Sequence, residues 1–110
     1  MIYVIESGGL YKIGFTSGRR VEPRMRALQT ASALPLKLID AMPGTMADEH
    51  AMHARFAHLR VHGEWFRLSE AELEWIAGAA HMGRALHGYP ETPPYRRELD
   101  RKRFEALLCS

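Results

Sequence analysis

A pair of glycines near the N-terminus is the strongest constraint on the fold of this chain. Gly8 and Gly9 separate two runs rich in β-branched and aromatic residues, Met1–Glu6 and Leu10–Thr16. Such runs on either side of a Gly-Gly pair are typical of a β-hairpin, because glycine adopts the positive φ angles that a tight turn needs. The chain is therefore expected to begin with two paired antiparallel strands.

The hydrophobic pattern after the hairpin predicts a helix, a strand and a second helix. Residues 21–31 follow a helical pattern, with Pro23 in the first turn, where proline is tolerated. Residues 35–42 alternate as in a strand. Thr45 and Asp48 have the spacing of a capping box, which predicts a helix from this point to about Leu59.

The rest of the sequence predicts a short aromatic strand or turn over residues 63–68 and a further helix from a second capping box, Ser69–Glu72. Glycines and prolines after His81 indicate a linker, which a short basic helix follows. We expect one unit over residues 1–82 and a linker with a helical tail over residues 83–110. The predicted fold class is α/β (α+β), with a small, mainly antiparallel three-stranded sheet between helices in the order β-β-α-β-α-(β)-α.

Length and composition exclude several classes of protein. The 110 residues suit one globular domain, and no apolar run approaches the roughly 20 residues of a membrane-spanning helix. Residues 1–10 do not resemble a signal peptide. The single cysteine, Cys109, excludes an internal disulfide framework and a four-cysteine zinc site. We expect a cytoplasmic protein with no membrane partner.

Charge is distributed unevenly, although the formal net charge is only +2. Residues 1–37 hold six basic and two acidic residues, whereas residues 38–76 hold three basic and seven acidic residues. Most of the basic residues are arginine, whose planar guanidinium binds phosphate through two hydrogen bonds. This distribution fits a site that holds phosphate with the first segment and a cation with the second. Internal salt bridges, together with the arginine-rich composition of a GC-rich genome, are the alternative explanation.

Two tyrosines are the first candidates for a functional site. Tyr3 and Tyr11 flank the Gly-Gly turn, so a two-stranded ribbon can present both hydroxyls from one face, with Lys12 beside them. A pair of packed cross-strand aromatics is the structural alternative.

Two charged residues on the predicted helices are the next candidates. Arg24 could reach over the sheet and hold a phosphate, or it could remain in solvent. Glu49 lies one helical turn before His53. A lone carboxylate of this kind can bind magnesium, which takes its other ligands from water and substrate phosphates.

Five short segments form a more specific pattern when they are taken in chain order. They are Ile2-Tyr3-Val4, Tyr11-Lys12-Ile13-Gly14, Pro23–Leu28, Glu49-x-x-x-His53-x-x-Phe56 and Arg60-x-x-Gly63-Glu64-Trp65-Phe66. Over residues 1–76 the pattern resembles the GIY-YIG nuclease superfamily, and within it the phage DNA-binding branch grouped with the meiotically up-regulated gene proteins.

This resemblance implies a metal-dependent endonuclease that hydrolyses DNA phosphodiester bonds. Glu49 would hold one Mg²⁺ or Mn²⁺ ion, and Arg24 would bind a phosphate oxygen. Either Tyr3 or Tyr11 would take the proton from the attacking water. The supporting residues would be Lys12 and His53, and the residues expected to contact DNA are Arg19, Arg20, Arg26 and Arg60. For Arg19, Arg20 and Arg26, ordinary exposure to solvent is the alternative that the residues themselves favour.

Phe15 and Leu28 depart from the family pattern. Nuclease members often carry a lysine at the first position and a histidine or tyrosine at the second. These departures favour the alternative function, a DNA-binding module of the same fold that does not cleave its substrate.

Two further features each have two interpretations. Trp65 and Phe66 could stack on an unpaired base, but two aromatics after a glycine turn are more often part of a core. The basic tail, Arg96–Arg103, could add phosphate contacts, or its helix could pack on the domain or on another subunit and form a homo-oligomer.

Overall fold

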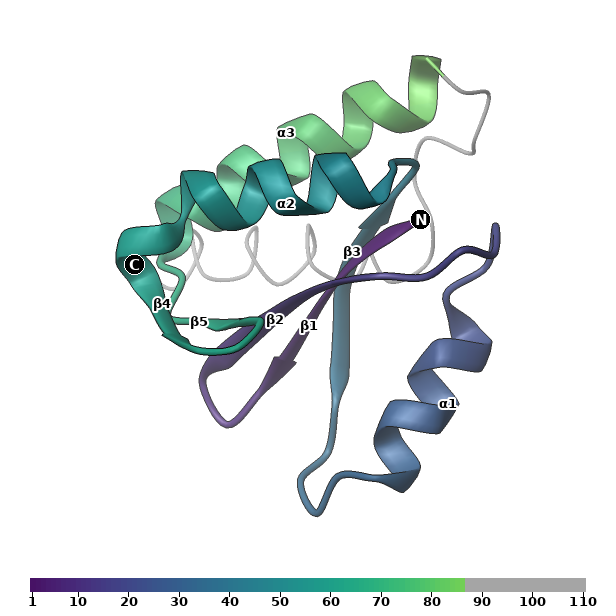
Figure 1. Ribbon diagram of the computed structural model, residues 1–110, viewed down its shortest axis with the longest axis vertical. Helices are drawn as coiled ribbons and strands as arrows, with labels where there is room; N and C mark the ends of the chain where they lie inside the picture. Colours follow the sequence, from purple (N-terminus) through teal and green to yellow (C-terminus); the bar gives the residue numbers. More distant parts are fainter. Residues whose placement is uncertain (87–110) are drawn as a thin grey trace, which may run out of the picture.

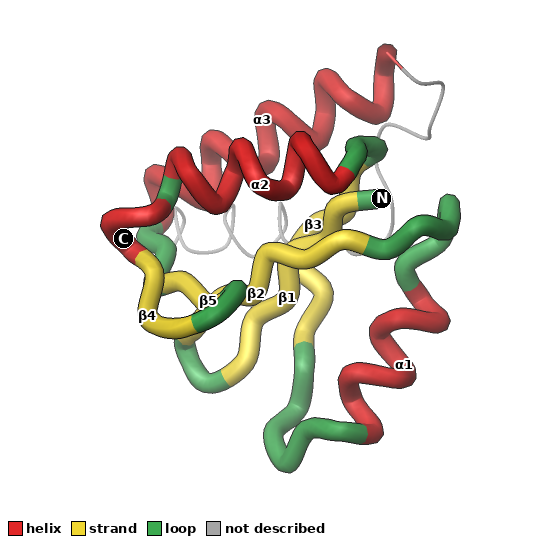
Figure 2. Tube along the Cα trace, viewed as in Figure 1, coloured by secondary structure: helices red, strands yellow, loops and turns green. Residues whose placement is uncertain are grey.

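The structure, a computed structural model, describes residues 1–86 as an antiparallel sheet with helices on both faces (Figure 1). The strands are β1 (Ile2–Ser7), β2 (Leu10–Phe15), β3 (Lys37–Met42), β4 (Arg60–His62) and β5 (Trp65–Phe66), in the sheet order β3-β1-β2-β5-β4. The helices are α1 (Glu22–Thr30), α2 (Met46–Arg55) and α3 (Glu70–Leu86), with a 3₁₀ turn, η1 (Ala57–Leu59), after α2. Helices α2 and α3 cover one face of the sheet side by side, and α1 lies on the other face (Figure 2).

The hairpin of β1 and β2 is closed by the two-residue turn that the sequence predicts. Gly8 and Gly9 have φ angles of 59° and 84°, and a type I′ turn needs a positive φ at both of these positions. Ser7 and Leu10 face each other on either side of the turn, and pairing continues along the whole length of both strands. The turn therefore fixes the register, which decides the face of the sheet that each side chain occupies.

The sheet has a hydrophobic core on each face. The larger core lies under α2 and α3, and its buried members are Ile2, Val4, Ile13, Ile39, Met42, Met52, Phe56, Phe66, Leu68, Leu73, Ile76 and Ala80. The smaller core lies under α1, and its buried members are Tyr3, Ile5, Val21 and Ala41. Met25 and Leu28 of α1 pack against this smaller core, but no residue of α1 is fully buried. Helix α1 is thus a partly exposed layer beside the sheet.

The sheet has five strands, so the predicted number of three is wrong, although β5 lies within the short aromatic strand or turn expected over residues 63–68. Strand β5 pairs with Tyr11 and Lys12 of β2, and β4 pairs with β5 at the edge. Gly63, with a φ of 54°, lies in the turn between them. Every residue of β4 is exposed, so this strand lacks the alternation of buried and exposed positions on which strand prediction depends.

The capping box at the start of α2 is confirmed. The Thr45 hydroxyl accepts the Asp48 N–H at 3.2 Å, and the Asp48 carboxylate accepts the Thr45 N–H at 2.8 Å. The helix ends at Arg55 instead of continuing to Leu59. The last predicted turn is the tighter 3₁₀ turn, in which the Leu59 N–H donates to the Phe56 carbonyl at 2.8 Å.

Helix α3 begins directly after Ser69, as predicted, but runs past His81 to Leu86. A buried ion pair accounts for the extra turn. Arg84 Nη1 donates to Asp40 Oδ1 at 2.9 Å and to the Ala41 carbonyl at 2.8 Å. A buried charge is costly without partners, so separating Arg84 from Asp40 would be unfavourable. The ion pair therefore holds the end of α3 against β3.

Residues 83–86 of the predicted linker belong to α3, and the rest of the linker and the basic tail lie outside the described residues. The division of the chain into residues 1–82 and 83–110 stays a prediction. Within the described part of the chain, the search for a helix long and apolar enough to cross a membrane finds none.

Gly14 provides a test of the packing on the α1 face. A Cβ atom at Gly14 would lie 2.4 Å from both Cζ and Oη of Tyr3, which stands opposite it in the register. We expect Gly14→Ala to lower the free energy of unfolding by about 1–3 kcal/mol in urea denaturation, because the buried ring has to move. Gly78→Ala is the matched control, since no atom outside the adjoining backbone of α3 lies within 4 Å of its Cβ position. It should stabilise the protein by about 0.5–1 kcal/mol. Equal stability of Gly14→Ala and wild type would contradict this packing.

Candidate functional site

Tyr3 and Arg24 connect the sheet to α1. Tyr3 is 1% exposed, and its hydroxyl accepts a hydrogen bond from Arg24 Nε at 3.4 Å. Arg24 follows Pro23 in the first turn of α1 and is exposed. Its pKa is raised by the hydrogen bond to Tyr3 and, further, by the Glu64 carboxylate, so the guanidinium stays charged. An exposed arginine that a buried tyrosine holds in one position is suited to binding an anion.

Gly14 makes this contact geometrically feasible. The register pairs Gly14 with Tyr3, and the space that a side chain would take at Gly14 is filled by the phenol ring. The Tyr3 hydroxyl therefore lies against the backbone of β2 at Gly14. A ligand bound to Arg24 would lie next to this point of the strand.

Glu49 lies on α2, against the opposite face of the sheet. It stands in the first turn of the helix, where the helix dipole and the free N–H groups favour a carboxylate. Its side chain is only 6% exposed, and its Oε1 lies 3.7 Å from His53 Nε2 and 3.8 Å from His50 Nε2. Glu49 is therefore a carboxylate enclosed by two imidazoles.

His53 attaches α2 to β2. Its Nε2 lies 2.8 Å from the carbonyl oxygen of Ile13. Because a carbonyl only accepts, Nε2 must carry the hydrogen. The imidazole also packs against Phe66, with 5.2 Å between the ring centroids. This contact sets the position of α2, and with it Glu49, relative to β2.

The two pairs of residues meet β2 at neighbouring positions. His53, with Glu49 beside it, contacts Ile13, and Tyr3, with Arg24 beside it, lies against Gly14. Strand β5 pairs only with Tyr11 and Lys12, so among the described strands β2 has one neighbour from Gly14 onward. This end of β2 is thus bordered by a cation from one face and a carboxylate from the other.

Tyr11 lies on the other face of the sheet from Tyr3, so the expected presentation of both tyrosines from one face is wrong. Tyr3 belongs to the core under α1, whereas Tyr11 packs against the core under α2 and α3. Burial raises the pKa of Tyr11, and the charges of Glu6 and Glu70 raise it further. A tyrosine that resists deprotonation is poorly suited to act as a base.

Lys12 shares the face of Tyr3, and its partner is a residue whose role the sequence did not indicate. Lys12 Nζ lies 3.0 Å from Glu64 Oε2, and the Glu64 carbonyl accepts the Ile13 N–H at 3.1 Å. Glu64 is also the acidic residue that raises the pKa of Arg24. The glycine turn before Glu64 in the Gly63–Phe66 segment was the available signal, because it allows the chain to return along β2.

Comparison with known protein families matches residues 1–80 to the T5orf172 domain. The chain belongs to the T5orf172 domain family. The family indicates a nuclease-like or DNA-binding role and specifies no activity. The comparisons with curated proteins and with solved structures find no match.

This membership corrects the resemblance to the GIY-YIG nucleases and to the branch named within them, because the T5orf172 domain is a different family and no GIY-YIG match is found. The structure also shows that the second motif does not place its tyrosine on the face where it was expected. Lys12 stands between Tyr11 and the Ile13-Gly14 pair, and strand side chains alternate between faces. Lys12, and not Tyr11, therefore shares the face of Gly14 and Tyr3.

The four arginines expected to contact DNA are all exposed on the T5orf172 domain, but they do not form one group. Arg19 and Arg20 lie between the end of β2 and the start of α1, and Arg20 Nε is 3.7 Å from a Glu22 carboxylate oxygen. Arg26 lies on α1 itself. Arg60 lies in β4 at the far edge of the sheet, with its guanidinium 5.4 Å from the centroid of the Phe66 ring.

The described residues contain no preformed metal-binding site with several protein ligands. Within residues 1–86, no group of three or more histidine, cysteine, aspartate or glutamate side chains is placed to hold an ion. Glu49 can supply one carboxylate oxygen, which suits a magnesium ion that keeps several waters. His53 Nε2 is engaged with Ile13, so this atom is not a free ligand.

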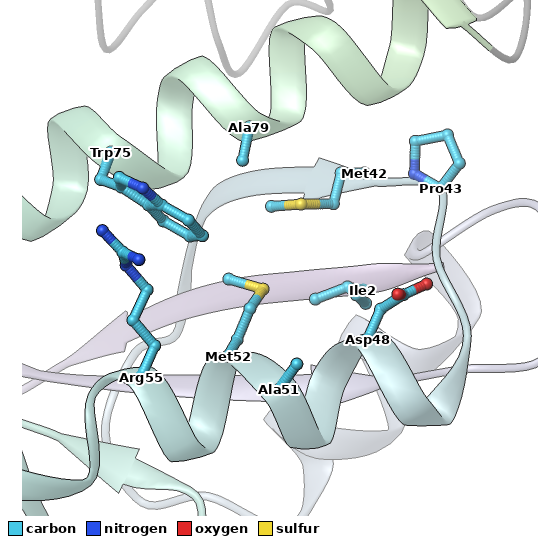
Figure 3. Close-up of a pocket in the computed structure, with 9 residues that line it drawn as sticks. All are labelled: Ile2, Met42, Pro43, Asp48, Ala51, Met52, Arg55, Trp75 and Ala79. Atoms are coloured by element: carbon cyan, nitrogen blue, oxygen red, sulfur yellow. The ribbon is translucent and has the colours of Figure 1, made fainter.

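The T5orf172 domain also has a groove between α2 and α3 (Figure 3), on the face of the sheet opposite Arg24. Its volume is about 440 Å³, and its lining residues are Ile2, Met42, Pro43, Asp48, Ala51, Met52, Arg55, Trp75 and Ala79. The Arg55 guanidinium lies 4.0 Å from the centroid of the Trp75 ring. None of the proposed catalytic residues lines this groove.

The role of His53 as a positioning residue can be tested by two substitutions. We expect His53→Ala to lower the free energy of unfolding by about 1–3 kcal/mol, because the Ile13 carbonyl loses its donor and Phe66 loses a packing partner. His53→Gln should recover part of this loss, since its amide N–H₂ can donate to the same carbonyl. Chemical denaturation of the two variants measures both effects. Equal losses in the two variants would contradict a hydrogen-bonding role.

Proposed function

We propose that this T5orf172 domain binds the backbone of DNA and hydrolyses phosphodiester bonds, with Tyr3, Arg24 and Glu49 as its central residues. The observation that carries the proposal is the arrangement around Gly14. An exposed arginine is hydrogen-bonded to a buried tyrosine there. The enclosed Glu49 carboxylate lies 3.7 Å from His53, which contacts the carbonyl of the adjacent residue of the same strand.

Arg24 would bind the phosphate. Its Nε donates to Tyr3, which leaves the Nη groups of an exposed residue for a ligand. Guanidinium groups match the geometry of phosphate oxygens and stabilise the negative charge that develops during hydrolysis. The loop that carries Arg19 and Arg20 adds positive charge next to the start of α1, where the DNA backbone would approach.

Tyr3, in its phenolate form after its hydroxyl proton has passed to solvent, would accept the proton of the attacking water. The Arg24 guanidinium lies beside this hydroxyl, with its Nε 3.4 Å from the Tyr3 oxygen. Tyr11 is the weaker candidate, because it lies on the other face and its pKa is raised. Of the two tyrosines that the sequence leaves open, Tyr3 is therefore the proposed base.

Glu49 would supply a carboxylate ligand to one Mg²⁺ or Mn²⁺ ion. When bound, such an ion stabilises charge on the phosphate and on the leaving oxygen. His53 keeps Glu49 next to β2, so its part in this account is to position a ligand.

A second candidate function is DNA binding without cleavage. The enclosure of Glu49 favours it, since a side chain that is 6% exposed and flanked by two imidazoles has to move before it can reach an ion. In that case Arg24 would still bind phosphate, and Glu49 would only stabilise the start of α2.

Plasmid nicking in the presence of Mg²⁺ or Mn²⁺, together with DNA-binding isotherms, tests the proposal. We expect Tyr3→Phe and Glu49→Gln to lower the nicking rate by about 10²-fold or more while DNA binding is kept. Arg24→Ala should weaken both nicking and binding, because it removes a phosphate contact.

The controls are Tyr11→Phe and Arg67→Ala, a tyrosine and an exposed arginine outside the proposed site, and both should behave like wild type. If wild-type protein leaves DNA intact with either ion and Glu49→Gln binds as well as wild type, the domain binds DNA without cleaving it.

A further inference from the structure

A small cleft lies between α1 and the sheet, beside the Tyr3–Arg24 contact. Its volume is about 260 Å³, and its lining residues are Ile5, Lys12, Leu28, Ala31, Ser32, Leu36 and Trp65. These residues come from β1, β2, α1, the connection that follows α1, and β5. Most of the wall is aliphatic, with one indole ring and one ammonium group.

Trp65 and Phe66 are neighbours in the chain, but they face opposite sides of the sheet. Phe66 is fully buried in the core under α2 and α3. Trp65 pairs with Lys12, lies on the α1 face and remains partly exposed at the cleft. Phe66 is therefore the core residue of the pair, and Trp65 offers an aromatic surface to a ligand.

The charge at the cleft suits a nucleotide. Lys12 Nζ lies 5.8 Å from the centroid of the Trp65 ring and 3.0 Å from Glu64 Oε2. A cation beside an aromatic ring is the combination that single-stranded nucleic-acid sites use for phosphate and base. The ion pair with Glu64 keeps Lys12 at the edge of the cleft until a phosphate competes for it.

Strand β2 and helix α1 each contribute residues both to the cleft and to the proposed phosphate site. Lys12 and Gly14 lie on the same face of β2, two residues and about 7 Å apart. Leu28 is one helical turn, about 6 Å, from Arg24 along α1. A nucleotide whose phosphate is bound by Arg24 has its base within reach of Trp65.

We propose that this cleft binds the base of one unpaired nucleotide of single-stranded DNA, which stacks on Trp65 while its phosphate contacts Arg24 or Lys12. This inference rests on the proposed function for the phosphate site. It adds the substrate class, namely DNA with an unpaired base at the site of binding.

Tryptophan fluorescence tests the proposal directly, because the chain has two tryptophans. In Trp75→Phe, all of the indole emission comes from Trp65. We expect an oligothymidylate to quench this emission with the same midpoint as binding measured by anisotropy. Trp65→Phe, which keeps Trp75, should bind the oligonucleotide with little quenching. Saturated binding with unchanged Trp65 emission would overturn the inference.

Affinity measurements provide a second test. Trp65→Ala should weaken oligothymidylate binding by about 5- to 150-fold, the range for one stacked base. Ala31→Phe should also weaken it by filling the cleft, whereas Ala27→Phe, at an exposed position of α1 outside the cleft, is the matched control. Equal affinities for Ala31→Phe and Ala27→Phe would overturn the inference even if Trp65→Ala failed to fold.

The outcomes separate this inference from the proposed hydrolysis. Nicking of duplex DNA without any change in Trp65 emission would contradict nucleotide binding in the cleft and would leave the proposed hydrolysis unaffected. Quenching of Trp65 without nicking would support the cleft and reject the hydrolysis.

Discussion

The register of the first hairpin determines where the other candidate site residues lie. The Gly8-Gly9 turn pairs Ser7 with Leu10, and this pairing places Tyr3 opposite Gly14. A shift by one residue would move Tyr3 from the α1 face to the α2 face and would place a side chain where the phenol ring now lies. The Tyr3–Arg24 contact and the cleft at Lys12 both depend on this register.

The second determinant is the attachment of the long helices to the sheet. His53 connects α2 to β2 at Ile13, and Arg84 connects the end of α3 to Asp40 of β3. Both contacts are polar groups buried against a hydrophobic core, where a missing partner costs more than on the surface. The His53 contact places Glu49 beside β2 on the α2 face, and the Tyr3 ring packs against the same strand on the α1 face. A carboxylate and an arginine that are 25 residues apart in the chain are thereby brought to adjacent residues of one strand.

The parts of the fold that sequence analysis predicted correctly are those with local signals. The Gly-Gly turn, the Thr45–Asp48 capping box and Pro23 in the first turn of α1 each act through neighbouring residues. The parts that it missed depend on distant contacts. Strand β4 is exposed and shows no alternation, and α3 is extended by an ion pair with a residue more than 40 positions away. The same limit applied to the site. Residue type and order made Tyr3, Arg24 and Glu49 candidates, and their roles stay predictions. The face on which Tyr11 lies depends on the number of residues between Tyr11 and Gly14, which Lys12 increases by one.

The most direct test of the central claim is a structure of the T5orf172 domain with a short oligodeoxynucleotide and Mn²⁺. The account predicts a phosphate hydrogen-bonded to Arg24 beside Gly14, and an ion that is coordinated by Glu49 and contacts that same phosphate. DNA bound away from Gly14, for example along the groove between α2 and α3, with Glu49 still enclosed by His50 and His53, would contradict it.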